Sequence, residues 1–401
     1  MRRLLLISLV LSLLSYQDEE PVPQNDSSFE ITQKVYELDF FPNHMHSGVV
    51  FDRILDQELL YFGDLTTAKK IVFFDFDGNE IQQVDLKNII QQTPHGVRNL
   101  TVIARDSILL MEEYTSTLIL ANEKGELNNK VDLTLFYPSD YLVEFNSSIF
   151  SDFSQNFLRD GVFVSYGLSP DNDFGQNSRI ESLKSYYNQV SERAYFVQFK
   201  NVLDTIKIKS LDHLIGFKQT YSPVDHFTFE FSHYNVHDDF ILFSSWYSDK
   251  LYIYDFHKQK MRKELKIESD YTTIGGTPFL ITEDNLQLMD SLLKIRGSFN
   301  GLINRFFYDE SNKNLFVQVY HEQKDRASDI RGAARPWSLL IYNDDLNKVF
   351  EKPFQHGEYS MGFTILTQKG LMLRRIDKNE QEFNKKNQTK RFSFDVFTFD
   401  L

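Results

Sequence analysis

The chain repeats one unit along its length: two apolar, aromatic-rich runs joined by a short polar turn, with a charged third run after most copies. The second run ends near an Asp or Asn, and its clearest copies lie at residues 71–80, 118–126, 194–202, 251–259, 339–347 and 394–401. One such unit cannot bury both of its apolar faces, so copies must pack against each other. The repeat therefore predicts an array of small antiparallel sheets.

The number of copies predicts the number of units in this array. Aligning the repeated runs places six anchor residues along the chain: Asp75, Ala121, Phe199, Asp255, Asn343 and Thr398. Six units predict an all-β fold, a six-bladed β-propeller with four antiparallel strands per blade. The clearest blades cover residues 47–86, 99–133 and 226–267. Short helical insertions are expected at 179–194 and 282–297, where apolar residues recur at helical spacing.

The two ends of the chain are expected to share a blade. The C-terminal region supplies only three strand-like runs, at 360–367, 371–377 and 390–401. The segment 29–40 precedes the first blade and lacks a sheet of its own. A ring closed by this N-terminal strand would have no exposed sheet edges between its first and last units. We therefore predict that segment 29–40 is the fourth strand of the last blade.

The N-terminal residues predict export. Residues 1–16 contain two arginines followed by an apolar run from Leu4 to Leu14, which is typical of a secretory signal peptide and short for a membrane span. A buried N-terminal helix is the alternative. Residues 17–28 are acidic and contain proline, as linkers do, and 29–401 is expected to be one propeller domain. No transmembrane span is predicted, so the protein should be periplasmic or associated with the cell envelope.

Charge and composition exclude several function classes. The formal net charge of −14 argues against a nucleic-acid partner, because phosphates require a basic surface. The chain contains no cysteine and therefore no disulfide, thiolate ligand or cysteine nucleophile. No G-x-S-x-G, H-E-x-x-H or phosphate-binding glycine loop occurs in the sequence. No catalytic residue is assigned, and a monomeric binding protein is favoured over an enzyme.

One insertion predicts a ligand-binding site. Residues 324–337 carry Arg326, Arg331 and Arg335 beside Trp337. Guanidinium groups recognise carboxylates or sulfates, and an indole stacks on sugar rings or cations. A solvated surface loop without a ligand is the alternative.

Three histidines form a second candidate site. His46, His95 and His356 each precede the start of a predicted innermost strand, and these strand starts should converge on the central channel. Imidazoles from three blades could bind Zn²⁺ or another divalent metal with one open position. Alternatively, these residues only form the repeated turn that enters each blade. No other cofactor is predicted.

The N-terminal region and the blade pattern resemble a known group of proteins. The sequence LLSYQDEE stands where an export signal and an acidic tag would lie, and one propeller follows. The chain resembles the uncharacterised six-bladed, TolB-like β-propeller lipoproteins of Bacteroidota. In that family a lipobox cysteine is acylated, but Tyr16 occupies this position here and cannot be lipidated. The resemblance implies the architecture and export, and it implies no activity.

These observations favour an exported binding or interaction module whose ligand is a glycan, a peptide or an envelope protein. The alternative is a metal-dependent propeller hydrolase or lyase that uses the channel histidines. A passive scaffold within an envelope complex is a third possibility.

Overall fold

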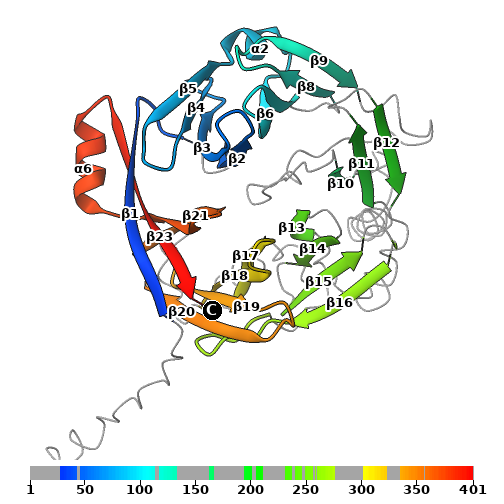
Figure 1. The fold of residues 1–401 in the computed structure, drawn as a ribbon, viewed down its shortest axis with the longest axis vertical. Coiled ribbons are helices and arrows are strands. Elements are labelled where there is room, and N and C mark those ends of the chain that lie inside the picture. The colour runs from blue at the N-terminus through cyan, green and yellow to red at the C-terminus, as the bar shows by residue number, and fades with distance from the viewer. Residues whose placement is uncertain are drawn as a thin grey trace, which may run out of the picture.

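The computed structural model describes residues 28–42, 46–112, 117–132, 162–166, 194–200, 205–210, 231–236, 240–245, 249–255, 258, 260–275, 301–322, 335–355 and 357–400. Antiparallel β-sheets dominate these residues, and they follow one another around a central axis (Figure 1). The repeat in the sequence therefore corresponds to a repeat of sheets in space.

The first three sheets come from residues 47–210 of the chain. The first contains β2 (Ser47–Asp52), β3 (Gln57–Asp64), β4 (Lys70–Phe74) and β5 (Glu80–Asp85). The second contains β6 (Val97–Ala104), β7 (Ser107–Glu112), β8 (Thr117–Ala121) and β9 (Leu127–Asp132). The third has three described strands, which are β10 (Val162–Tyr166), β11 (Ala194–Lys200) and β12 (Thr205–Ser210).

Three further sheets follow. The fourth contains β13 (Phe231–Val236), β14 (Phe240–Ser245), β15 (Lys250–Asp255) and β16 (Lys260–Lys266). The fifth contains β17 (Leu302–Asp309), β18 (Asn314–Tyr320), β19 (Trp337–Tyr342) and β20 (Lys348–Phe354). The sixth contains β21 (Tyr359–Thr367), β22 (Gly370–Arg375), β23 (Lys390–Asp400) and β1 (Ser28–Leu38). The four-stranded units predicted near 47–86, 99–133 and 226–267 are confirmed, although residues 226–230 lie outside the described residues.

The N-terminal strand belongs to the C-terminal sheet. β1 pairs with β23 along its whole length, from Ser28 opposite Asp400 to Leu38 opposite Lys390. The aromatic side chain of Tyr36 in β1 is fully buried and contacts the rings of Phe62, in β3, and Phe394, in β23. β1 therefore packs the sixth sheet against the first.

Buried side chains fill the spaces between neighbouring sheets. Within the described residues, separate apolar clusters lie between the first and second, the sixth and first, the fifth and sixth, and the fourth and fifth sheets. The first strands of neighbouring sheets also contact each other, as β21 does with β2 and β13 with β17, which places them on the inner side. Each fully buried Phe or Leu contributes about 1.5–3 kcal/mol to folding. The sheets are thus held together face to face.

The repeated Asp or Asn is a turn residue. The Asp75 Oδ1 atom accepts hydrogen bonds from the backbone of Asp77 and Asn79, both at 2.9 Å. The Asn122 Oδ1 atom accepts the same kind of bond from the Glu126 backbone N–H, also at 2.9 Å. The Asn343 Oδ1 atom accepts one from the Asn347 backbone N–H. Such side chains imitate a backbone turn and fix the hairpin between the third and fourth strands. This function explains why the residue recurs at the end of the second apolar run.

The described residues also form two helices outside the sheets. α2 (Lys87–Gln92) follows β5, and α6 (Lys378–Lys386) connects β22 to β23. The Asp377 side chain accepts a hydrogen bond from the Asn379 backbone at 2.7 Å and caps α6. Neither helix was predicted. The predicted helices at 179–194 and 282–297 lie outside the described residues, apart from Ala194, which begins β11. No helix in the described part of the chain has the length and apolar composition needed to cross a bilayer.

Candidate functional site

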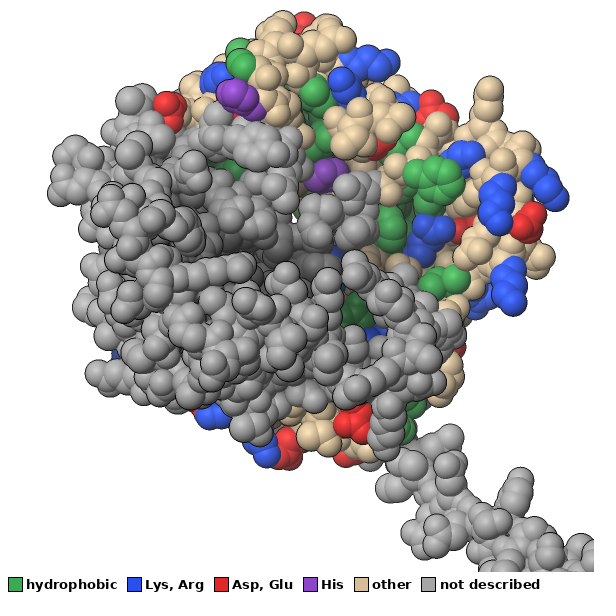
Figure 2. Space-filling model, turned by 180° about the vertical axis from the view of Figure 1, so that it is seen from behind, with side chains coloured by type: hydrophobic (Ala, Val, Ile, Leu, Met, Phe, Trp, Pro, Cys, Tyr) green, Lys and Arg blue, Asp and Glu red, His purple; other side chains and the backbone are tan. Residues whose placement is uncertain are grey.

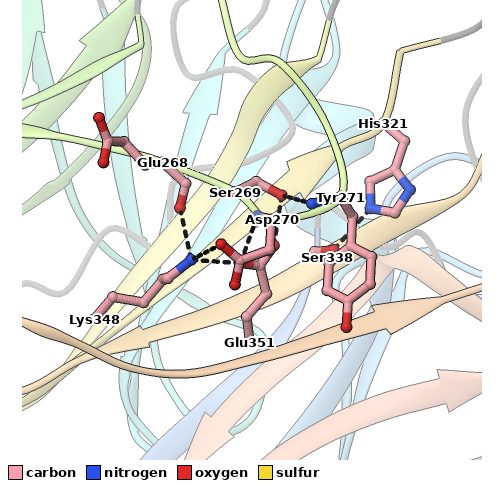
Figure 3. A network of polar contacts seen from close by, with 8 residues as sticks. All are labelled: Glu268, Ser269, Asp270, Tyr271, His321, Ser338, Lys348 and Glu351. Atoms are coloured by element: carbon pink, nitrogen blue, oxygen red, sulfur yellow. Dashed lines mark hydrogen bonds and ion pairs between the residues drawn. The ribbon is translucent and has the colours of Figure 1, made fainter. Parts of the chain in front are cut away.

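A short segment after β16 crosses to the fifth sheet. We call residues 268–275 the strap. The Glu351 carboxylate receives hydrogen bonds from the Ser269 hydroxyl at 2.5 Å and from the Asp270 backbone at 3.0 Å (Figure 3). The Lys348 ammonium lies 2.8 Å from the same carboxylate and 2.9 Å from that of Asp270. These bonds fix the first half of the strap on β20.

The second half of the strap is fixed on the inner strands. The Thr272 hydroxyl accepts a hydrogen bond from the Glu322 backbone at 2.8 Å. Ile274 forms a parallel bridge with Gly301, just before β17. A Cβ atom at Gly301 would lie 2.6 Å from the Thr273 carbonyl oxygen, so this close approach requires glycine. The strap is therefore held at both ends on one sheet.

An aromatic pair lies at the centre of the strap. The ring of Tyr271 stacks parallel to that of His321, with 6.2 Å between centroids and 9° between planes. The Tyr271 side chain is 37% exposed, whereas His321 is half-buried. The His321 Nε2 atom lies 2.7 Å from the Ser338 Oγ atom in β19 (Figure 3). Tyr271 thus presents a ring to solvent from a fixed support.

Arg335 connects the residues on either side of segment 323–334, which are 321–322 and 335–336 and which we call its two stems. Its Nε atom donates a hydrogen bond to the His321 carbonyl oxygen at 2.7 Å. The His321 backbone N–H donates to the Pro336 carbonyl oxygen at 2.9 Å. The guanidinium lies 5.2 Å from the ring centroid of Tyr320, and burial lowers the pKa of Arg335 to about 10. The segment therefore starts and ends on a rigid base.

The other residues of the predicted ligand site have different surroundings. Trp337 is the first residue of β19 and only 1% exposed, and its indole stacks on Phe354 with 4.3 Å between centroids. It lies in the apolar cluster between the fifth and sixth sheets. Arg326 and Arg331 lie outside the described residues. Arg335 alone of the predicted arginines is placed, and it belongs to the base of the segment.

The three candidate metal ligands are placed in part. His46 immediately precedes β2 and is buried against Gly63, where a Cβ atom would lie 3.3 Å from that of His46. His95 is exposed between α2 and β6, and His356 lies outside the described residues. The described residues hold no group of three His, Asp or Glu side chains arranged to bind a metal ion. A metal site that includes His356 stays a prediction.

The His321–Ser338 pair has the composition of a nucleophile and its base. A nucleophile must reach the substrate, and Ser338 is 0% exposed within the described residues. Burial and the nearby Arg335 charge lower the pKa of His321, so the imidazole is neutral near pH 7. The pair is thus suited to hold the ring of His321 beneath Tyr271. This arrangement is suited to binding a ligand on the rigid surface that Tyr271 and His321 form.

The protonation of His321 gives a prediction for stability. Because its pKa in the folded state lies below the usual value, the unfolded chain binds this proton first as the pH falls. The stabilisation that the neutral His321 ring provides is complete above pH 6.5 and decreases as the pH falls below that value. In His321→Gln the fall in melting temperature between about pH 7.5 and about pH 5.5 should be smaller than in the wild type. Equal falls in both proteins would contradict this assignment.

The comparisons with known proteins indicate a fold. No protein-family model matches the chain, and no curated protein is significantly similar to it. The structure is similar to that of a DUF4221 family member from Bacteroides vulgatus, with a TM-score of 0.65 and 15% sequence identity over 94% of this chain and 99% of that one. This chain shares the fold of that protein, a propeller-like array of antiparallel four-stranded sheets.

Two other solved structures are more distant. A Bacteroides fragilis protein named as exported has 11% identity over 95% of this chain and 98% of its own, with a TM-score of 0.49. A streptogramin B lyase has 10% identity over 92% of this chain and 98% of its own, with a TM-score of 0.40. These similarities are too low to carry any conclusion about this protein.

Proposed function

We propose that this protein is an exported, six-bladed β-propeller that binds a glycan, a peptide or an envelope protein. The binding site consists of Tyr271 on the strap and the adjacent segment 323–334, with its Arg326 and Arg331. The observation that carries the proposal is the fixed, exposed ring of Tyr271 beside the two stems that Arg335 joins. Loops on a rigid support are where binding residues concentrate. Trp337 supports this site from the core.

The architecture in this proposal rests on the order of the sheets. Six antiparallel sheets follow one another along the described residues, and apolar clusters join those whose side chains are described. We propose that each is one blade and that β1 closes the ring by pairing with β23. Closure would leave the six inner strand starts on one face, and the strap contacts Gly301 before β17 and Glu322 after β18 on that face.

Export is supported by the sequence before β1. The arginines and apolar run of residues 1–16 have the order of a secretory signal, and residues 17–27, which precede β1, provide an acidic linker. We propose that the propeller folds after export in the periplasm or at the cell envelope. The chain resembles Bacteroidota propeller lipoproteins, but Tyr16 removes the acylation site.

Binding to arrays of glycans and of peptides tests the proposal. A ligand of the wild-type chain should bind Tyr271→Ala at least about tenfold more weakly, because the variant loses the stacking surface. Phe51→Ala is the matched control, since it removes another exposed ring that lies at the far end of β2. Equal binding by all three proteins would overturn this site. One bound metal ion per chain, lost in His95→Ala, would instead favour the hydrolase or lyase alternative.

A further inference from the structure

The α6 region has a charge opposite to that of the whole chain. Residues 374–391 contain seven Lys or Arg and three Asp or Glu, whereas the net charge of the protein is −14. The three arginines pair with Glu380, Asp395 and Glu37, so the positive excess of this surface comes from its lysines. Seen from behind, Lys and Arg side chains spread along this edge of the described surface, at the right of the view (Figure 2). Interactions between exposed charges are screened beyond about 10 Å, so a local basic surface acts independently of distant acidic residues.

Polar contacts hold α6 rigidly on β23. The Glu380 carboxylate accepts hydrogen bonds from Arg374 and from the Ser393 backbone, the latter at 2.7 Å. The Asn384 amide donates to the Arg391 carbonyl at 2.8 Å and accepts from the Arg391 backbone N–H at 2.6 Å. The helix is therefore a fixed platform, and its basic side chains keep a defined spacing.

The basic side chains at the C-terminal end of α6 are accessible. The side chains of Lys385 and Lys386 are 71% and 74% exposed. Both pair with Glu382, at 3.2 Å and 3.8 Å. Such exposed pairs contribute only about 0–1 kcal/mol, so another anion can replace Glu382 at little cost.

An exposed aromatic ring adjoins this basic surface. Phe41, just after β1, is 58% exposed and packs edge-on against Phe392. The Lys390 ammonium lies 5.1 Å from the Phe41 ring centroid and donates hydrogen bonds to the carbonyl oxygens of Asn384 and Asn387 at the end of α6. A flat apolar ring beside the Lys390 ammonium group matches an acidic sugar, which presents C–H groups on one face and a carboxylate or sulfate at its edge.

The surface of α6 does not match a bilayer. Interfacial helices insert an apolar face between lipids. The exposed residues of α6 are polar, and the guanidinium of Arg391 covers its Phe383 ring at 3.9 Å from the centroid. A water-soluble polyanion is therefore the better partner.

We propose that α6 and Phe41 form a docking surface for an acidic polysaccharide that carries carboxylate or sulfate groups. This surface is separate from the proposed site at Tyr271 and does not depend on it. Lys385 and Lys386 contact the anionic groups, Lys390 positions the ring, and Phe41 packs on the sugar.

Binding of the full chain to polygalacturonate tests this surface, with neutral dextran as the control polymer. The wild type should bind polygalacturonate and not dextran, and raising the salt from about 50 to about 300 mM should weaken binding. Lys385→Glu/Lys386→Glu should lower the affinity about tenfold or more. Lys260→Glu/Lys263→Glu makes the same change in net charge on the exposed part of β16 and should bind within about twofold of the wild type.

Four further measurements separate the alternatives. Phe41→Ala should weaken binding to polygalacturonate. If this variant binds as tightly as the wild type, and the wild type binds polyaspartate with the same affinity, the partner is an acidic polypeptide and the proposal is overturned. Binding only to vesicles that contain phosphatidylglycerol would overturn it in favour of a membrane. Tyr271→Ala should keep wild-type affinity for polygalacturonate. Equal losses in both double variants would show a nonspecific charge effect and also overturn the proposal.

Discussion

A chain that begins at residue 41 is expected to lose its cooperative unfolding transition and to aggregate. The deletion removes β1, exposes the edge of β23 and uncovers the aromatic cluster around Tyr36. Replacing Tyr36 alone by Ala should cost about 3–5 kcal/mol, because a fully buried aromatic ring is lost. That is a large part of the stability of an ordinary domain. Thermal unfolding and size-exclusion chromatography would measure the effect.

A circular permutant separates the strand from its position in the sequence. Ser28 lies directly opposite Asp400, so a short turn can join the two ends and make β23 and β1 a hairpin. A permutant that starts at residue 41 and ends with residues 28–40 should unfold within a few degrees of a chain that starts at residue 28. If the simple deletion were as stable as that chain, β1 would not contribute to the core.

Glu380→Ala is expected to destabilise the protein by about 3–5 kcal/mol. The side chain of Arg374 is 15% exposed, and its guanidinium lies between Glu380 and the ring of Phe392, 4.3 Å from the centroid. Burial lowers the pKa of Arg374, which shows how unfavourable this environment is for an isolated charge. Loss of the carboxylate leaves that charge buried without its partner, and the Ser393 N–H loses its acceptor.

Unfolding of three variants in denaturant would test whether the lost stability arises from the unpaired buried charge of Arg374. Glu382→Ala, in the same helix but exposed, should change the free energy of unfolding by less than about 0.5 kcal/mol. The double variant Arg374→Met/Glu380→Leu should recover much of the stability lost in Glu380→Ala, because it removes both buried charges. Equal destabilisation by Glu380→Ala and by the double variant would show that the effect arises from helix packing.

The strands and turns were predictable because their signals are local. Alternating and continuous apolar runs predict strands, and Asp75, Asn122 and Asn343 end them with the side-chain bonds that turns require. The pairing of the chain ends could also be inferred, since three C-terminal strands needed a fourth. α6 was missed because Glu380 and Asn384 attach it through polar groups, and no apolar stripe reveals such a helix.

The candidate site was predictable only in part because it depends on distant contacts. Tyr271 and His321 are far apart in the sequence, and no spacing rule joins a residue of the strap to the end of β18. The neighbourhood of Arg335 was identified from its composition. The sequence places Trp337 in that loop, but Trp337 begins β19 and shares with Leu339 and Ile341 the face that packs on the sixth sheet. A one-residue difference in where the strand begins decides whether such a ring belongs to the loop or to the core.

The pairing of β1 with β23 also has a consequence for the order of folding. Ser28 is synthesised long before Asp400, yet the two residues are partners in one ladder. The sixth sheet cannot form before β23 has been synthesised, and contacts between residues so far apart in the sequence slow this step. β1 therefore stays without its partner strand while the sheets between the two are being synthesised. Under the proposed export, the sixth sheet would stay unformed until β23 itself has crossed the membrane.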